Sequence, residues 1–176
     1  MKKTITLLAL ALSLASAVGC KNDKTADTTE NQAESADIKT EIMAVADKFH
    51  TSFKAKKPDD IKNLLTETGV FMGTDPEEVY NQQGFIDYLM KKLGNPAIGT
   101  ITYEIDRRET VIDESGNGVT LVDQFIPIVF TQNIPWRMTA HLTKKDGAWK
   151  YDFISLSMIP KNDVVPYINM AAHKDE

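Results

Sequence analysis

The sequence predicts an α+β domain in which helices come first and a mainly antiparallel sheet follows. Apolar residues between positions 38 and 53 recur every three or four residues, which is the period of one face of a helix. From about position 98 to position 159, apolar and polar residues alternate between glycine-containing turns, as in half-buried strands. Because the two patterns are segregated along the chain, they favour helices packed on one sheet over alternating βαβ units.

Three helical segments are expected before the sheet. The first runs for about 18 residues from Asp37. Pro58 lies beyond its end and opens a short second helix, because proline suits the first helical position. Ahead of the third helix, residues 75–78 have the form of a helix start, with Asp75 as N-cap. The third helix is expected over residues 84–93.

Four long strands are expected in the second half, over residues 98–112, 119–131, 136–144 and 149–159. The first and last of the turns between them contain glycine, and Asp146-Gly147 is typical of a tight hairpin. Pro135 breaks the alternation before the third of these strands, because proline cannot donate a ladder hydrogen bond. One further short strand is expected over residues 70–72.

The first twenty residues have the layout of an export signal. Lys2 and Lys3 precede an apolar run too short to span a bilayer, and small residues come before Cys20. This segment resembles the lipobox of bacterial lipoproteins. The resemblance implies cleavage before Cys20, a diacylglycerol on its sulfur and a third acyl chain, such as palmitate, on its amine. Two or three acyl chains hold a protein stably on a membrane. The alternative is a soluble exported protein in which Cys20 has no special role.

The expected organisation follows from this signal. Residues 1–19 form the signal peptide, 20–36 the lipidated cysteine and a disordered tether, 37–160 one domain and 161–176 a C-terminal tail. Residues 21–36 contain no large apolar side chain, so they cannot bury enough surface to offset chain entropy. We expect the protein in the bacterial cell envelope, held on a membrane through Cys20, and on the outer membrane if the host has one.

Charge and cysteine content exclude several classes of protein. The chain carries a net charge of −5, which becomes −7 once Lys2 and Lys3 leave with the signal, whereas nucleic-acid binding needs a basic surface. Cys20 is the only cysteine, so the fold must rest on an apolar core without disulfides. Three separated histidines give no metal-ligand spacing. We therefore expect no nucleic acid, no metal and no cofactor.

Three segments carry a resemblance to a known family. Residues 71–75 read Phe-Met-Gly-Thr-Asp, residues 134–139 read Ile-Pro-Trp-Arg-Met-Thr, and residues 146–149 read Asp-Gly-Ala-Trp, with Ser157 and Pro160 after them. In this order they resemble the f-x-G-T-D, l-P-W-R-x-T and d-G-x-W…S…P segments of the SnoaL-like domains, which belong to the nuclear transport factor 2-like (cystatin-like) superfamily. The resemblance covers residues 37–160. It departs from the family at Ser155, where members often carry a histidine.

The resemblance implies a cone, in which N-terminal helices pack on a strongly curved sheet and the wide end stays open as a pocket. Relatives include isomerases, dehydratases and cyclases, and other members bind a ligand or only assemble. The fold therefore does not decide the function. We also expect a homodimer formed through the outer face of the sheet.

Two residues are candidates for catalysis. Asp123 lies mid-strand among apolar residues, where burial would favour its neutral form and suit it to act as a general base. Alternatively, Asp123 pairs with Arg108 or Arg137. His141 is either an acid or base, or an ordinary surface residue. His50 is assigned no role.

A ligand pocket is expected to be lined by aromatic and polar side chains of the strands, namely Tyr103, Phe125, Trp136, Arg137, Phe153 and Ser155. If Arg137 points into the cone, it offers a fixed fork for a carboxylate or carbonyl group. Strand alternation places Trp136 and Met138 on the face opposite Arg137, so only one of these sets can line the cone. The aromatic side chains either line the cavity or fill it.

Three functions follow from these observations. The leading one is a lipid-anchored envelope domain that binds a small, partly apolar ligand or a partner protein without turnover. The first alternative is an isomerase- or dehydratase-like enzyme that transfers a proton in the cone pocket, and the absence of the common histidine at Ser155 weighs against it. The second alternative is a dimerisation or assembly domain with a filled cone. An open pocket that holds a perturbed acid–base pair would favour the enzyme.

Overall fold

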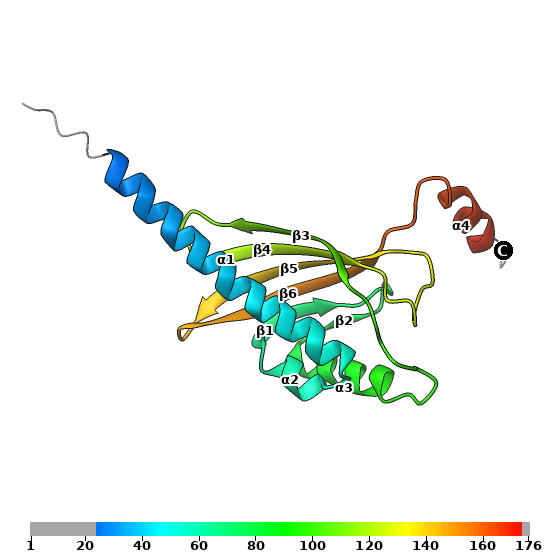
Figure 1. The fold of residues 1–176 in the computed structure, drawn as a ribbon. Helices are drawn as coiled ribbons and strands as arrows, with labels where there is room; N and C mark the ends of the chain where they lie inside the picture. Colours follow the sequence, from blue (N-terminus) through cyan, green and yellow to red (C-terminus); the bar gives the residue numbers. More distant parts are fainter. Residues whose placement is uncertain (1–23, 174–176) are drawn as a thin grey trace, which may run out of the picture.

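The computed structural model describes residues 24–173, in which one long helix lies across one face of a sheet (Figure 1). The helices are α1 (Lys24–Lys54), α2 (Pro58–Lys62), α3 (Gln82–Leu93) and α4 (Val165–Ala172). The strands are β1 (Leu65–Met72), β2 (Val79–Tyr80), β3 (Ile105–Ile112), β4 (Gly118–Phe125), β5 (Trp136–Lys145) and β6 (Ala148–Met158). The predicted signal peptide and Cys20 lie outside the described residues.

The six strands form one sheet in the order β2-β1-β6-β5-β4-β3. Strands β3 to β6 form the antiparallel meander that the alternation predicts, while β1 pairs with β6 in parallel. Register shifts interrupt β1 between Leu65 and Val70 and β5 between His141 and Leu142, and such irregularities bend strands. The predicted α+β class with a mainly antiparallel, curved sheet is confirmed.

The core lies between α1 and the inner face of the sheet. Ile42, Phe49 and Phe53 of α1 are buried, as the helical period predicts. The sheet contributes alternate residues of its strands, and Leu121 of β4 and Met138 of β5 are both 0% exposed. Because Met138 and Trp136 point inward, the apolar set of this strand faces the core and Arg137 faces outward.

The first helix is longer than predicted. It begins at Lys24, so residues 24–36 are helical and do not form the disordered tether expected from their composition. Figure 1 shows this part of α1 extending beyond the end of the sheet. The segment contains neither glycine nor proline, so nothing in its backbone chemistry stops a helix. A low apolar content excludes packing in a core, but it does not exclude helix formation.

Two other segments differ from expectation. Asp75 caps a turn and does not begin a helix. The amide N–H of Glu77 donates to the carboxylate of Asp75 at 3.0 Å, and β2 starts at Val79, two residues after Glu77. Strand β4 ends at Phe125, before Pro127, because proline lacks the N–H that would continue the ladder.

In the tail, α4 buries none of its side chains, and it lies at the end of an extended segment away from the sheet (Figure 1).

Candidate functional site

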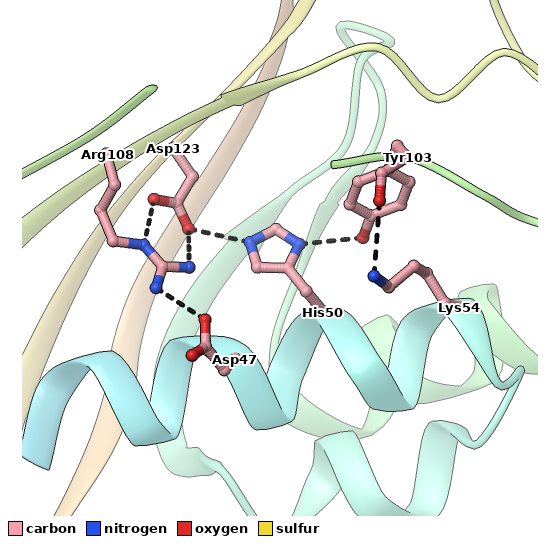
Figure 2. Close-up of polar contacts among 6 residues, drawn as sticks. All are labelled: Asp47, His50, Lys54, Tyr103, Arg108 and Asp123. Carbon is pink, nitrogen blue, oxygen red and sulfur yellow. Dashed lines mark hydrogen bonds and ion pairs between the residues drawn. The ribbon is translucent and has the colours of Figure 1, made fainter. Parts of the chain in front are cut away.

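The side chain of His50 joins α1 to the sheet inside the cone (Figure 2). Its Nε2 lies 2.9 Å from Oδ2 of Asp123, and its Nδ1 lies 2.9 Å from the hydroxyl oxygen of Tyr103. Asp123 is 0% exposed and His50 is 3% exposed. The helix places His50 here because Ala46 and Phe53, one turn away on either side, lie on the same buried stripe.

Arg108 of β3 holds the carboxylate of Asp123 from the other side. Its Nε donates to Oδ1 at 2.7 Å and its Nη2 donates to Oδ2 at 2.9 Å, which is a bidentate pair. Its Nη1 donates to Asp47 of α1 at 2.7 Å. Arg108 and Asp123 are directly opposite in the β3–β4 ladder, so their side chains share a face. We call Asp47, His50, Tyr103, Arg108 and Asp123 the His50 network.

The network keeps Asp123 ionised. Burial raises the pKa of this carboxyl, but the hydrogen bonds from His50 and Arg108 and their charges outweigh burial, so the pKa lies below its ordinary value. Pairing with Arg108 was one of the two predicted alternatives, and the structure shows it. The expectation that burial keeps Asp123 neutral is therefore wrong, because it took account of the apolar neighbours and not of the hydrogen bonds from Arg108 and His50.

The ionised carboxylate sets the direction of the other hydrogen bonds. Because Asp123 can only accept, Nε2 of His50 must carry the proton between them. Burial and the charge of Asp123 raise the pKa of Tyr103, so its phenol keeps its proton. In neutral imidazole the Tyr103 hydroxyl therefore donates to Nδ1, and in imidazolium it accepts from Nδ1–H. Both ring nitrogens are engaged in either state.

A cleft of about 550 Å³ opens beside the network, between α1 and residues 104–108. His50 and Arg108 belong both to the network and to the wall of this cleft. Lys54 also lines it, with its Nζ 3.4 Å from the carbonyl oxygen of Tyr103 and 5.3 Å from the centre of that ring. The cleft therefore gives a small molecule access to polar groups that the fold holds in place.

Aromatic rings of α1 and of the sheet side pack against one another inside the fold. Tyr103 and Phe125 stack with 4.6 Å between ring centroids, and Phe130 packs on Trp136 at 5.5 Å. Phe53 of α1 lies 6.4 Å from Tyr103 and 6.3 Å from Phe130. These side chains therefore pack against one another.

The other predicted ligand-binding residues lie on the outer face of the sheet. Arg137 is exposed, with its Nη2 3.5 Å from the side-chain oxygen of Gln124. The β5–β6 register places Phe153 and Ser155 on that same face. The six residues expected around one pocket are thus divided between two faces, and the three that point into the cone are Tyr103, Phe125 and Trp136.

The two catalytic candidates are not brought together. His141 lies on the outer face, where its Nδ1 is 2.7 Å from Oδ1 of Asp152 and its side chain is 42% exposed. The histidine that Asp123 contacts is His50, which sequence reasoning left without a role. One signal could have found it: His50 is a titratable residue at a position that the helical period assigns to the buried stripe of α1.

Two further features of residues 24–173 bear on function. This range contains no group of three or more histidine, cysteine, aspartate or glutamate side chains placed to hold a metal ion. It also contains no helix with the length and apolar content needed to cross a membrane.

Solved structures of other proteins share this architecture, which is the nuclear transport factor 2-like fold. A protein of Novosphingobium aromaticivorans, provisionally described as a scytalone dehydratase, matches with a TM-score of 0.61 at 10% identity over 73% of this chain and 89% of its own. A nuclear transport factor 2-like protein of unknown function from Pseudomonas putida matches with 0.60 at 11% identity, over 71% and 89%. Another from Cytophaga hutchinsonii matches with 0.54 at 16% identity, over 67% and 95%. At these identities the likeness shows the fold alone.

The sequence itself identifies the family. The model of the SnoaL-like domain matches residues 42–161, which is more than half of the chain, and the chain therefore belongs to the SnoaL-like domain family. The resemblance drawn from the three sequence segments is thus confirmed. No match was found among curated proteins.

Proposed function

We propose that the protein binds a small molecule in the cleft between α1 and residues 104–108, against the His50 network, and does not turn it over. One observation carries this proposal: a cleft of about 550 Å³, within the usual range for small-molecule sites, ends on polar groups already fixed by hydrogen bonds. Groups fixed in advance orient a ligand without a further loss of side-chain entropy.

The cleft wall favours a small, partly apolar ligand with a polar group. Met43 and Ile105 contribute apolar surface, Lys54 and Arg107 contribute positive charge, and Glu104 contributes negative charge. A ligand without polar groups would cover these charges and leave them unpaired, which is unfavourable.

The hydrogen bonds of His50 argue against catalysis. A general base needs a free lone pair within hydrogen-bond reach of the proton that it removes. Nε2 of His50 is engaged by Asp123 and Nδ1 by Tyr103, and the residue is 3% exposed. The imidazole therefore has no lone pair to offer a substrate in this state.

A proton-transfer enzyme of the isomerase or dehydratase type is the second candidate, and the Asp123–His50 pair favours it. An ionised carboxylate behind an imidazole orients the ring and stabilises its protonated form. If a ligand displaced the Tyr103 hydroxyl, Nδ1 of His50 would gain the free lone pair that a base requires. The neighbour provisionally described as a scytalone dehydratase supports this candidate by analogy of fold only.

A variant that fills the cleft tests the binding proposal. Thr51 is exposed and lines the cleft, so Thr51→Trp should block it and leave the His50 network intact. Thr120→Trp, at an exposed threonine on the outer face of β4, is the matched control. With hydroxybenzoates and small cyclic ketones as probes, we expect chemical-shift changes of backbone amides around residues 50–54 and 104–108 in the wild type and in the control. Changes confined to another surface, or unaffected by Thr51→Trp, would contradict the proposal.

Deuterium exchange separates binding from catalysis. A ketone that binds in heavy water should keep its α-protons at the uncatalysed rate if the site only binds. Exchange that is accelerated by the wild type and lost in His50→Gln would instead establish the proton-transfer enzyme, because His50 is the group placed to carry the proton.

Anchorage and assembly are further parts of the proposal. The lipobox-like segment supports attachment to an envelope membrane through Cys20. A homodimer is supported by the outer face of β4, β5 and β6, which none of the helices covers in Figure 1. Sedimentation of the Cys20→Ala protein should then give twice the mass of one chain, and a monomer at all accessible concentrations would contradict the dimer.

A further inference from the structure

A second cleft lies at the opposite edge of the sheet from the His50 network. It has a volume of about 830 Å³ and is formed by β2, α3 and the turn that follows α3. Strands β2 and β3 are the two edge strands, so four strands separate this cleft from the first one. The proposed function makes no use of it.

One wall of this cleft is the outer end of a column of aromatic rings. Tyr80 stacks on Tyr88 with 5.2 Å between centroids, Tyr88 on Phe85 at 6.3 Å, and Phe85 on Phe71 at 5.4 Å. All three pairs are within 27° of parallel. Phe71 and Phe85 are 0% and 1% exposed, so the column is anchored in the core and ends at Tyr80. Tyr80 therefore offers a ring whose position is fixed before any ligand arrives.

Charged side chains of both signs stand beside this ring. Oε2 of Glu78 accepts from the backbone N–H of Thr74 at 2.9 Å and of Asp75 at 3.2 Å, which fixes the carboxylate. Nζ of Lys92 lies 3.8 Å from Oε1 of Glu78 and 5.5 Å from the centre of the Tyr88 ring. Lys91 and Asn95 complete the polar rim.

The phenols of the column also remain hydrogen-bond donors. Burial raises the pKa of Tyr88, and so do the charge of Glu78 and a hydrogen bond with it. Burial and the charges of Glu78 and Asp75 raise the pKa of Tyr80. The rim thus presents the Tyr80 hydroxyl and the ammonium groups of two lysines as donors, while the Tyr88 hydroxyl donates to the carboxylate of Glu78.

Gly73, in the Phe-Met-Gly-Thr-Asp segment of residues 71–75, lies against Glu78 at the rim of this cleft. A Cβ at position 73 would overlap the Glu78 side chain, with the terminal oxygen closest and the Cβ and Cδ atoms at 2.9 Å. A residue larger than glycine would therefore displace the carboxylate from the rim. Gly73, in one of the three segments that carried the family resemblance, therefore leaves room for the carboxylate at the rim of the second cleft.

The chemistry of the cleft selects one class of ligand. An apolar molecule would bury the charges of Glu78 and Lys92 without a polar partner, which is unfavourable. A strongly anionic molecule would be repelled by Glu78, and a cationic one by Lys91 and Lys92. An uncharged ring with many hydroxyl groups fits all of these features, since each hydroxyl both donates and accepts and the C–H face of the ring can pack on Tyr80. We propose that this cleft is a saccharide-binding site, with Tyr80 as its stacking platform.

The experiment measures binding of soluble oligosaccharides to the full domain. Chitotetraose, maltotetraose and cellotetraose would be titrated and followed by chemical shifts of the amides of residues 78–80 and 88–95, with benzoate as a probe for simple aromatic stacking. We expect at least one saccharide to bind with a Kd of about 1 mM or tighter. Binding of benzoate alone, or of none of the four probes, would overturn the proposal.

Variants of one residue type make the result specific. Tyr80→Ala should weaken saccharide binding by about tenfold, because it removes the platform, whereas Tyr80→Phe should retain it. Tyr167→Ala, at a tyrosine of α4 that is 67% exposed, is the matched control and should bind as the wild type does. Thermal unfolding checks that Tyr80→Ala is folded. If it is not, Tyr80→Phe still tests the platform, because loss of saccharide binding in this variant, which keeps the ring, would overturn stacking as the main contact. Equal affinity in Tyr80→Ala and the wild type would overturn the proposal, while Thr51→Trp should leave saccharide binding unchanged whatever the first cleft does.

Discussion

Replacing Asp123 by asparagine tests the central physical feature of the candidate site. The substitution keeps the shape of the side chain and removes the negative charge between Arg108 and His50. Three hydrogen bonds of 2.7, 2.9 and 2.9 Å end on that carboxylate, and Arg108, whose side chain is 15% exposed, keeps the exposed Asp47 as its negatively charged partner. Breaking a buried ion pair by removing one partner costs about 3–5 kcal/mol.

The same substitution at Asp152 is the control. Asp152 also contacts a histidine at 2.7 Å, but this pair lies on the outer face with 42% and 34% of its two side chains exposed. Exposed ion pairs contribute about 0–1 kcal/mol, so Asp152→Asn should be close to the wild type. Asp123→Asn should lower the Tm by roughly 10 °C, given about 2–4 °C per kcal/mol for a domain of this size.

Urea unfolding near neutral pH measures the difference directly. Circular dichroism and tryptophan fluorescence should give coincident transitions, and the variants should share one m-value so that midpoints report stability. If Asp123→Asn and Asp152→Asn were equally stable to within about 1 kcal/mol, the buried pair would not stabilise the fold as argued.

Further predictions concern pH, packing, backbone and modification. Because the pKa of Asp123 is lowered in the folded state, the advantage of the wild type over Asp123→Asn should be fully present above the unfolded-state pKa of about 4 and should shrink as the pH falls below it, which urea titrations at several pH values would show. Leu142→Ala, at a residue 0% exposed, should cost about 2–5 kcal/mol in the same assay, and a loss below 1 kcal/mol would contradict its place in the core. Gly147 has a φ of +78° in the β5–β6 turn, so Gly147→Ala should cost about 1–2 kcal/mol, whereas Gly99→Ala, with no atom near its added Cβ, should cost nothing measurable. Mass spectrometry of membrane-extracted protein should find an added lipid that Cys20→Ala loses, and an unmodified wild-type mass would contradict lipidation.

The elements of the fold could be predicted from the sequence where local pattern decides them. The stripe through Phe49 and Phe53 predicts α1, and the alternation from residue 119 predicts β4, because one buried face gives each element its period. The expected end of this strand at residue 131 was wrong, since β4 ends at Phe125. The pairing of β1 with β6 could not be predicted in this way, since a strand's partner depends on packing between distant segments. The extra turns of α1 could not be predicted from a buried face, because the helix forms there without one.

Only some contacts of the candidate site could be predicted from the sequence. Arg108 could be named as one possible partner of Asp123, because residues opposite each other in a hairpin share a face. His50 could not, since it lies 73 residues from Asp123 and belongs to a helix. Alternation alone did not show which face of β5 points into the core. In the structure the larger apolar set, which includes Trp136, is the buried one.

The parallel pairing of β1 with β6 can form only late in the synthesis of the chain. β1 ends at Met72, and the strand beside it begins only at Ala148, so most of the protein must be synthesised before this ladder can close. Until then Phe71 has no β6 neighbour to cover it, and the nascent chain presents an open strand edge of the kind that chaperones bind. Contacts between residues so far apart in sequence also slow folding, because the intervening loop must be ordered first.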